Sequence, residues 1–460
     1  MPPMPAYEPT VESLHQHPVP RWFADAKLGI LVHWGPSSVP GWAPLGLDPM
    51  ARGSVDGWEV AFRENAYAEW YWNTMSLDGS PTERHHKEEW GGRPYEEFAG
   101  DFDAASSTWD PVSWAQPFAA AGARYVVLTT KHHDGYLLWP SRHPNPHIDG
   151  WQSPRDIVGD ITDAVRAEGM EMGLYYSGGI DWTFTGLPIS DLPSMFRAIP
   201  TSDDYAAYAD AHWRELIERY RPAVLWNDIG YPQQAGAHQL FVDYYATIPE
   251  GIVNDRFDML GVAAGTAHAD FRTPEYAQMD DITTHHWESV RGISHSFGYN
   301  QLETDTDLAS PTELVHLLVD IVSKNGNLLL GVGPMGDGSI PAIQQSRLTA
   351  LGSWLDVNGE AIFGTRPWAV PASTTGDGLE VRYTTRDGDL FATILGTPTA
   401  SRVAIHGLVP ADGTRVSLLG GTEVPFTASP AGLAVELGLL PPESPAHCLR
   451  IHPAPTLQGS

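Results

Sequence analysis

One order of hydrophobic and polar positions recurs over the first two thirds of the chain. An amphipathic helix is followed by a short break at Gly or Pro, then by about five apolar residues, and then by a polar cluster. In the clearest case helical spacing over 156–168 ends at Gly169, and the apolar run over 170–176 leads into Ser177. The predicted helices are 113–121, 156–168, 201–221 and 313–323, and the predicted strands are 28–32, 125–129, 170–176, 223–226, 251–253 and 327–332.

Helices that alternate with continuously apolar strands indicate a parallel sheet covered on both faces. Six such strands favour an α/β fold of the (β/α)8-like barrel class, with the site at the carboxyl ends of the strands. An open doubly wound sheet fits the same order. No G-x-G-x-x-G sequence follows the first strand and no Walker motif occurs, so dinucleotides and nucleotides are disfavoured and no cofactor is expected.

The pattern changes near Pro367. Leu379, Val381 and Tyr383 alternate with polar residues, Asp387-Gly388 is typical of a hairpin turn, and 391–395 reads as the returning strand. We therefore predict two domains, a catalytic barrel over 1–365 and a C-terminal antiparallel β-sandwich over 366–460. The second domain has few clustered acids or histidines, so we expect it to be structural.

The charge balance narrows the partners. With 27 Lys and Arg against 57 Asp and Glu, the formal net charge is −30, which excludes a nucleic-acid binder and disfavours anionic membranes and polyanionic substrates. A neutral or cationic small ligand is the expected partner, and the oligomeric state is left open. The first thirty residues lack a secretory signal and no apolar run reaches membrane-spanning length, so a cytoplasmic location is expected. Cys448, the single cysteine, is expected to be a buried hydrophobe.

The predicted strand ends carry His33, His132, His133, Asp228 and Arg256. A metal-dependent barrel hydrolase is one interpretation, but side chains alternate along a strand, so His132 and His133 cannot both face one metal unless the chain turns there. No H-x-H pair occurs at these strand ends and no H-E-x-x-H helix occurs, and no metal is expected. The run 85–89 and the pair 285–286 are interpreted as solvated surface.

Glycoside hydrolysis is the second interpretation, and it needs two carboxylates across the scissile bond. Asp228 follows a buried strand directly after Trp226, where it is either an ionised catalytic group or the cap of a following helix. Glu275 and Glu288 are candidates for the protonated partner, and Glu288 could instead pair with Arg291 on a helical turn. The residue pattern alone leaves this choice open. The 17 Trp residues fit either a large core or flat faces for a sugar.

Six motifs, in the same order, resemble those of glycoside hydrolase family 29, the α-L-fucosidases. They cover about residues 20 to 365, and the β domain that follows also fits the family. The motifs are W-F-A-D-A-K-L-G with H-W-G-P (22–29 and 33–36), E-W-Y (69–71), Y-V-V-L-T-T-K-H-H-D-G (125–135), L-W-N-D (225–228), S-F-G-Y-N (296–300) and K-N-G-N-L-L-L with G-P (324–330 and 333–334).

The resemblance implies a retaining exo-α-L-fucosidase that releases terminal α-L-fucosyl residues through a covalent intermediate. It implies Asp228 as the nucleophile and Glu275 as the acid/base, with Glu288 in reserve because the segment 256–275 is longer than usual. Trp34, Trp70 and Trp226 fall in motifs expected to line the sugar pocket. A non-catalytic fucose-binding protein on the same scaffold is the alternative. The implied sugar contacts are His33, Glu69, Trp70, His132, His133, Tyr175, Trp226, Arg256 and Phe297.

Overall fold

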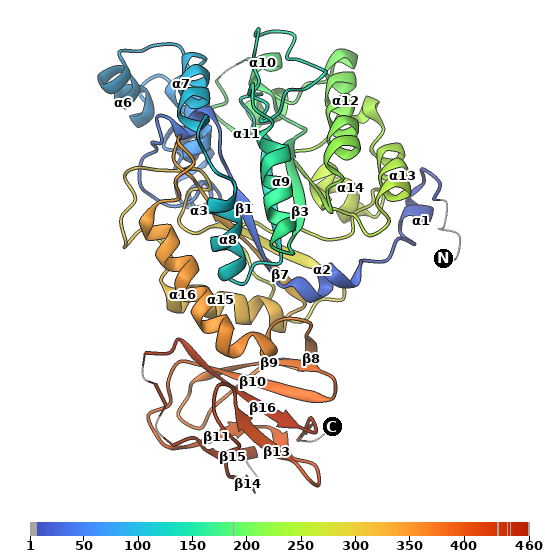
Figure 1. Cartoon of the computed structure of the whole chain (residues 1–460), viewed down its shortest axis with the longest axis vertical. Helices are drawn as coiled ribbons and strands as arrows, with labels where there is room; N and C mark the ends of the chain where they lie inside the picture. The colour runs from blue at the N-terminus through green and yellow to red at the C-terminus, as the bar shows by residue number, and fades with distance from the viewer. Residues whose placement is uncertain (1–6, 187, 430–431, 439, 442, 459–460) are drawn as a thin grey trace.

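A parallel sheet surrounded by helices forms the first unit of the computed structural model, which describes residues 7–458 except 187, 430–431, 439 and 442 (Figure 1). Its strands follow the spatial order β5-β4-β3-β2-β1-β7-β6. Each of the six predicted strands is present. The strands are β1 (Leu28–Val32), β2 (Tyr125–Lys131), β3 (Glu171–Ser177), β4 (Val224–Asp228), β5 (Ile252–Val253), β6 (Trp287–Gly292) and β7 (Gly326–Val332).

An irregular segment closes this sheet into a ring. Residues 271–275 lie between β5 and β6, where Phe271 bridges Asn254 and Glu275 bridges Val290, both in the parallel sense. The closed ring confirms the predicted (β/α)8-like barrel and not the open doubly wound sheet. The helical turn considered for Glu288 and Arg291 is wrong, because both residues lie in β6. Three positions apart in a strand, their side chains point to opposite faces.

Alternating side chains of the buried strands fill two layers. In β2, Val126 and Leu128 belong to the cluster shared with the surrounding helices, whereas Tyr125 and Val127 belong to the cluster inside the ring. The ring interior is tightly filled, since a Cβ at Gly29 would lie 2.4 Å from the Tyr125 ring. A continuously apolar strand suits this setting because both of its faces are covered.

The predicted helices are confirmed with small shifts at their ends. The longest begins after Ser202, whose side chain accepts a hydrogen bond from the Tyr205 backbone N–H, and ends at a left-handed Arg221 just before Pro222. The helices are α1 (Val11–Leu14), α2 (Arg21–Ala26), α3 (Pro49–Asp56), α4 (Trp58–Arg63), α5 (Tyr71–Met75), α6 (Pro81–Trp90), α7 (Glu97–Ser106), α8 (Val112–Ala120), α9 (Ile157–Ala167), α10 (Trp182–Thr185), α11 (Leu192–Arg197), α12 (Asp203–Tyr220), α13 (Ala237–Thr247), α14 (Met259–Ala264), α15 (Pro311–Ser323) and α16 (Ala342–Asn358).

Antiparallel sheets form the second unit, as predicted for a β-sandwich. A five-stranded sheet has the order β13-β16-β10-β9-β8, and a three-stranded sheet has the order β11-β15-β14. Cys448 is buried here, and burial raises the pKa of its thiol to about 12. The strands are β8 (Arg366–Thr374), β9 (Glu380–Arg386), β10 (Asp389–Leu395), β11 (Arg402–His406), β12 (Leu408–Val409), β13 (Arg415–Leu418), β14 (Phe426–Ser429), β15 (Gly432–Glu436), β16 (Ala446–His452) and β17 (Thr456–Leu457).

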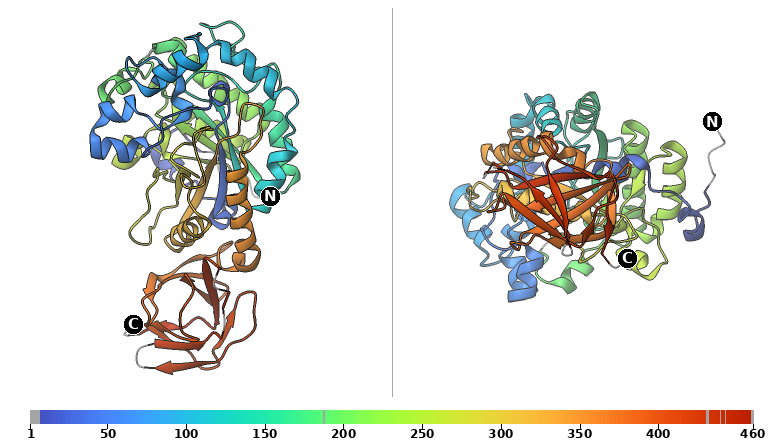
Figure 2. Two further views of the ribbon diagram at one scale, coloured as in Figure 1. Left: turned by 90° about the vertical axis from the view of Figure 1, so that its left-hand side faces the viewer. Right: turned by 90° about the horizontal axis from the view of Figure 1, so that it is seen from below.

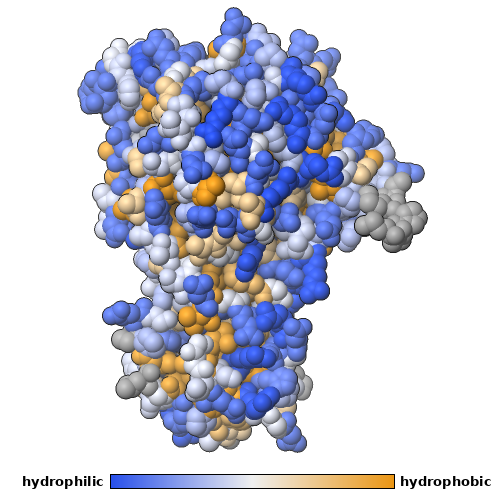
Figure 3. Space-filling model, in the orientation of Figure 1, coloured by the Kyte–Doolittle hydropathy of each residue, from blue (hydrophilic) through white to orange (hydrophobic). Residues whose placement is uncertain are grey.

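The β unit packs under the end of the barrel where the strands begin (Figure 2). Arg366, the first residue of β8, forms an ion pair of 2.8 Å with Asp25, just before β1. Hydrophobic residues gather where the units meet, whereas hydrophilic residues cover most of the face in Figure 3. Within the described part of the chain, no helix is long and apolar enough to cross a bilayer.

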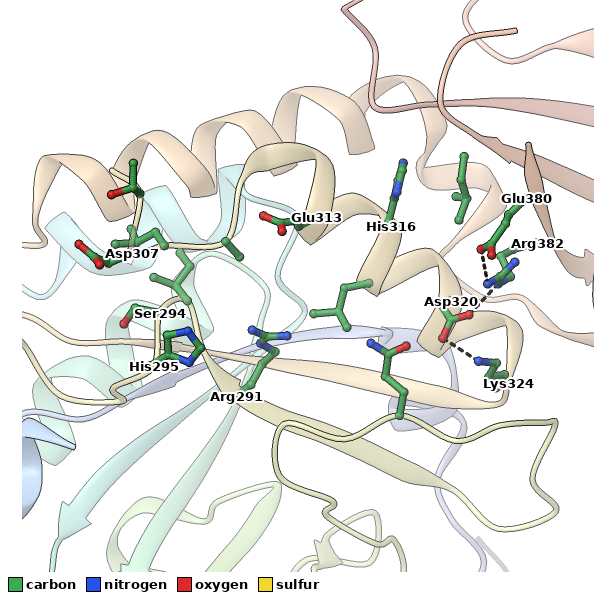
Figure 4. A pocket seen from close by; sticks show the side chains of 17 residues that line it. Arg291, Ser294, His295, Asp307, Glu313, His316, Asp320, Lys324, Glu380 and Arg382 are labelled. Atoms are coloured by element: carbon green, nitrogen blue, oxygen red, sulfur yellow. Dashed lines mark hydrogen bonds and ion pairs between the residues drawn. The ribbon is translucent and has the colours of Figure 1, made fainter. Parts of the chain in front are cut away.

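A polar groove of about 640 Å³ runs along this junction (Figure 4). At one end Asp320 of α15 accepts from Arg382 of β9 at 2.6 Å and from Lys324 at 2.8 Å. Glu380 also pairs with Arg382, so two cations face two carboxylates, and the Asp320–Arg382 pair crosses the junction. The groove therefore joins the two units and shares no residue with the site formed at the strand ends.

Candidate active site

A separate cavity of about 130 Å³ opens at the carboxyl ends of the barrel strands. Every predicted site residue except Glu288 lines it, although these residues are spread over more than 260 positions of the sequence. They come from the ends of β1 to β4, the loops after β1, β5 and β6, and the closing segment. The predicted residues that line the cavity are His33, Glu69, Trp70, His132, His133, Tyr175, Trp226, Asp228, Arg256, Glu275 and Phe297.

One guanidinium joins the two candidate catalytic carboxylates. Arg256 donates from one terminal nitrogen to Oδ1 of Asp228 at 2.9 Å and from the other to Oε2 of Glu275 at 3.0 Å. The guanidinium carbon also lies 4.8 Å from the ring centre of Trp226. Because its two terminal nitrogens are fixed in one plane, Arg256 orients the two carboxylates relative to each other.

Asp228 is held as an ionised carboxylate at the last position of β4. Burial opposes its ionisation, but the charge of Arg256, the nearby His133 and a 2.7 Å hydrogen bond from the Tyr175 hydroxyl outweigh burial, so the pKa of Asp228 is lowered. Asp228 is not the N-cap of a described helix, since the next helical turn begins at Gln233. The alternative of a capping role is therefore wrong.

The backbone directly after Asp228 is strained. Ile229 has a φ of +60°, a region that β-branched residues rarely adopt. Two neighbouring loops fix it there, because Gly179 donates from its backbone N–H to the carbonyl of Asp228 at 3.1 Å and Gly230 donates to that of Arg256 at 2.9 Å. A Cβ at Gly179 would lie 2.2 Å from the Ile229 carbonyl oxygen, so only glycine permits this approach.

Glu275 lies opposite Asp228 in the closing segment and is 19% exposed at its side chain. Besides Arg256, Tyr67 contacts it, donating from its hydroxyl to Oε1 at 2.6 Å. Burial, followed by the charge of Glu275, raises the pKa of Tyr67, so Tyr67 stays a neutral donor. The sequence reasoning missed Tyr67, although it precedes the Glu69-Trp70-Tyr71 motif by only two residues.

Glu288 lies inside the barrel and does not line the cavity. Its side chain accepts hydrogen bonds from the Tyr125 hydroxyl and from Trp226 Nε1, so both of its oxygens are occupied. Burial raises the pKa of Glu288 to about 7. Its geometry suits a buried anchor for Trp226 better than contact with a substrate.

Three histidines form one side of the cavity. The chain leaves β2 at Lys131, which lets both His132 and His133 face the same space. Burial lowers the pKa of His33 to about 3 and that of His133 to about 4, and lowers the pKa of His132 as well. All three rings are therefore neutral near pH 7. Such rings can donate to and accept from sugar hydroxyls, and the buried Nδ1 of His33 has no hydrogen-bond partner among the residues that the structure describes.

Glu69 completes the polar side. It accepts from the Gly298 backbone N–H at 2.8 Å and from the Ser296 hydroxyl at 3.3 Å, and burial raises its pKa to about 7. Among the residues that the structure describes, no group of three or more His, Cys, Asp or Glu side chains is placed to hold a metal ion.

Aromatic rings form the remaining walls. Tyr175 stacks on Trp226 with centroids 5.4 Å apart, and Phe297 lies 5.3 Å from His33 and 5.4 Å from Tyr67. Flat apolar faces beside hydroxyl-binding groups suit a small neutral sugar.

Two expectations near the site are corrected. Trp34 does not line this cavity but a small neighbouring one that shares His33, Glu69 and His132 with it. Its Nε1 donates to the Met335 carbonyl at 2.7 Å and its ring packs on Trp114 in the core. His86, in the run interpreted as solvated, is buried on α6 between the Tyr71 hydroxyl and the Arg93 carbonyl. In both cases long-range packing decides the environment.

Comparison with known proteins points in the same direction. A family model described as alpha-L-fucosidase matches residues 3–360. An alpha-L-fucosidase of Dictyostelium discoideum is 31% identical over 95% of this chain and 92% of its own, and the tissue alpha-L-fucosidase of Mus musculus is 32% identical over 95% and 91%. The crystal structure of Thermotoga maritima alpha-fucosidase in complex with fucose superposes with a TM-score of 0.85 at 40% identity, covering 97% of this chain and 100% of that one.

Proposed function

The chain belongs to the α-L-fucosidase family of glycoside hydrolases, and from that premise we propose that it releases terminal α-L-fucosyl residues with retention of configuration at the anomeric carbon. The observation that carries this proposal is the shared contact of Asp228 and Glu275 with Arg256. Retaining enzymes need carboxyl groups about 5 to 5.5 Å apart, whereas inverting enzymes need about 6.5 to 9.5 Å to admit a water. One guanidinium bridging both groups favours the shorter separation.

In the first step Asp228 attacks C1 of the fucosyl group, forming a covalent ester as the glycosidic bond breaks. Glu275 transfers its proton to the departing oxygen. In the second step Glu275 accepts a proton from water, whose oxygen attacks C1 and releases Asp228. The lowered pKa of Asp228 keeps the free nucleophile ionised before it attacks and after it is released.

The cavity suits a neutral deoxy sugar. His33, His132 and His133 are uncharged at neutral pH and can contact ring hydroxyls, while Trp226 and Phe297 supply apolar faces for the ring and the C5 methyl group. The fucose complex of the Thermotoga protein supports the same ligand class for this chain.

Two measurements test the mechanism. Proton NMR of the first turnovers should show α-L-fucose before the β anomer accumulates, and early β-L-fucose would overturn retention. A 2-deoxy-2-fluoro fucosyl fluoride should trap a covalent adduct, and peptide mass spectrometry should find it on Asp228. A label on another carboxylate would reassign the nucleophile.

A fucose-binding protein without activity is the competing function. An aryl α-L-fucoside separates the two, since the proposal requires release of the aryl alcohol by the wild-type protein. Binding of fucose without release would favour the competitor.

A further inference from the structure

The outer part of the catalytic cavity is lined differently from its inner part. The residues that helices α3, α4 and α11 and the strained Ile229 contribute to the lining carry no ionisable group. We call them the apolar rim, which consists of Pro49, Met50, Trp58, Phe62, Met195 and Ile229.

Met50 marks the open side of the cavity, whereas Phe62 of the rim is buried. Met50 is 49% exposed, whereas Asp228 and Arg256 at the strand ends are buried. The helices that carry the rim also expose apolar side chains to solvent, since Phe196 on α11 is 67% exposed and Val55 on α3 is 72% exposed. Exposed apolar side chains that continue from a ligand cavity mark a surface for a partner group.

The rim is held by the protein and is not loosely attached. Asp48 caps α3 by accepting from the Met50 and Ala51 backbone N–H groups at 3.1 and 3.0 Å. Gly53 packs directly on Trp58, since a Cβ there would lie 2.8 Å from the indole, and the Trp58 ring lies 6.4 Å from that of Phe62. On this segment Arg52 forms ion pairs with both Asp56 and Glu64.

The position of the rim indicates which part of the substrate contacts it. The inner end of the cavity is closed by buried residues of the barrel, such as Leu31 and Val290, so a fucosyl group whose C1 lies at the two carboxylates must direct its leaving group outward. We propose that the apolar rim is the leaving-group subsite, and that it selects fucosides whose aglycone presents an apolar face, such as an alkyl chain, over strongly hydrated ones. This inference rests on the proposed function.

Octyl and methyl α-L-fucoside test it, because their leaving alcohols differ in apolar area far more than in acidity. Each buried methylene is worth a factor of about four, so contact with two of them should raise kcat/KM for the octyl fucoside at least about tenfold over the methyl fucoside. In the Met50→Ser/Met195→Ser double variant this ratio should fall to about two or less. A substitution that changes the rate of bond cleavage equally for both fucosides leaves this ratio of kcat/KM values unchanged.

Met259→Ser is the matched control. Met259 and Met50 each lie in the first turn of a helix, α14 and α3, that an Asp side chain caps. Met259 is 52% exposed, close to the 49% of Met50, but it does not line the cavity. This variant should keep the wild-type ratio. A wild-type ratio near one, an unchanged ratio in the double variant, or a kcat/KM for 2′-fucosyllactose more than about tenfold above that for the octyl fucoside would each overturn the proposal.

Failure of the proposed function would look different. Wild-type protein that leaves α-L-fucosyl fluoride intact is not a fucosidase, since this substrate makes no demand on the rim. In that case calorimetry on the same variants gives the Kd of the octyl and methyl fucosides. The rim proposal then requires that wild type binds the octyl fucoside more tightly than the methyl fucoside, and that the double variant loses this preference.

Discussion

Trp226 donates a 2.9 Å hydrogen bond from its indole nitrogen to Oε1 of Glu288, which joins the cavity wall to the barrel interior. The Trp226 ring in turn stacks on Tyr175, whose hydroxyl binds Asp228. Glu288 thus acts on the nucleophile through two aromatic residues and is a positioning residue. This relationship separates its function from that of Glu275.

Replacement of the two glutamates should therefore have unequal effects. Glu288→Gln keeps an acceptor for Trp226, so kcat/KM should stay within about tenfold of wild type, whereas Glu275→Gln removes the transferable proton and should lower it by about 10²- to 10⁴-fold on substrates with poor leaving groups. Azide should restore turnover of an aryl fucoside to Glu275→Ala by attacking the fucosyl-enzyme. If azide instead rescues Glu288→Ala and not Glu275→Ala, the acid/base is Glu288.

Glu288 should also make folding stability depend on pH. The pKa of Glu288 in the folded state is about 7, above the ordinary 4.5, so the folded state binds this proton more tightly than the unfolded state does. The stabilisation that protonated Glu288 gives the folded state is therefore lost as pH rises from 4.5 to 7. Between about pH 5 and about pH 8, wild type should lose about 2 to 3 kcal/mol of unfolding free energy that Glu288→Gln does not lose.

Urea unfolding at both pH values measures this difference. Glu218→Gln serves as the control, because Glu218 is 67% exposed at its side chain. Equal pH slopes for wild type and Glu288→Gln would show that Glu288 does not titrate in this range.

The strain at Ile229 leads to a prediction that compares two variants. Glycine adopts a φ of +60° freely, whereas alanine retains the cost of about 1–2 kcal/mol that a left-handed conformation imposes on L residues. The free energy of unfolding of Ile229→Gly should therefore be about 0.5 to 1 kcal/mol higher than that of Ile229→Ala. At a residue with ordinary backbone angles the alanine variant would be the more stable one. The kcat of Ile229→Gly should be several-fold lower than that of Ile229→Ala, because a freer backbone holds Asp228 less firmly. A glycine variant no more stable than the alanine variant would contradict stored strain.

Most of the fold could be predicted because the barrel strands are continuous apolar runs. Covered on both faces, β1, β2 and β4 carry almost no polar residue until they end, and the polar residues at or after those ends mark the site. The elements that escaped prediction lack this signal. In β6, Glu288 and Arg291 interrupt the run, and the closing segment contains Pro274 and is held by single bridges to its neighbours.

The site was predictable where motifs carry it and not where distant loops meet. The apolar rim comes from short helices inside long loops, and their sequence gives no indication of which cavity they approach. Tyr67 and Glu275 are 208 positions apart in the sequence, and their hydrogen bond can form only once the barrel has closed. Trp34 shows the converse, since it lies in a site motif but packs into the core.

Tyr67→Phe should weaken catalysis without unfolding the protein. The hydroxyl donates to Glu275 at 2.6 Å, and a hydrogen bond to a carboxylate is worth about 1.5 to 3 kcal/mol, so its loss should lower kcat/KM by about tenfold or more as Glu275 becomes free to rotate. The loss should be larger for methyl α-L-fucoside than for α-L-fucosyl fluoride, because fluoride leaves without proton transfer from Glu275. Tyr71→Phe is the control, since Tyr71 is also buried but its hydroxyl binds His86 on α6. That variant should lower the melting temperature and leave the methyl-to-fluoride ratio unchanged, whereas an equal fall for both substrates in Tyr67→Phe would mean that Tyr67 binds the sugar and does not hold the acid.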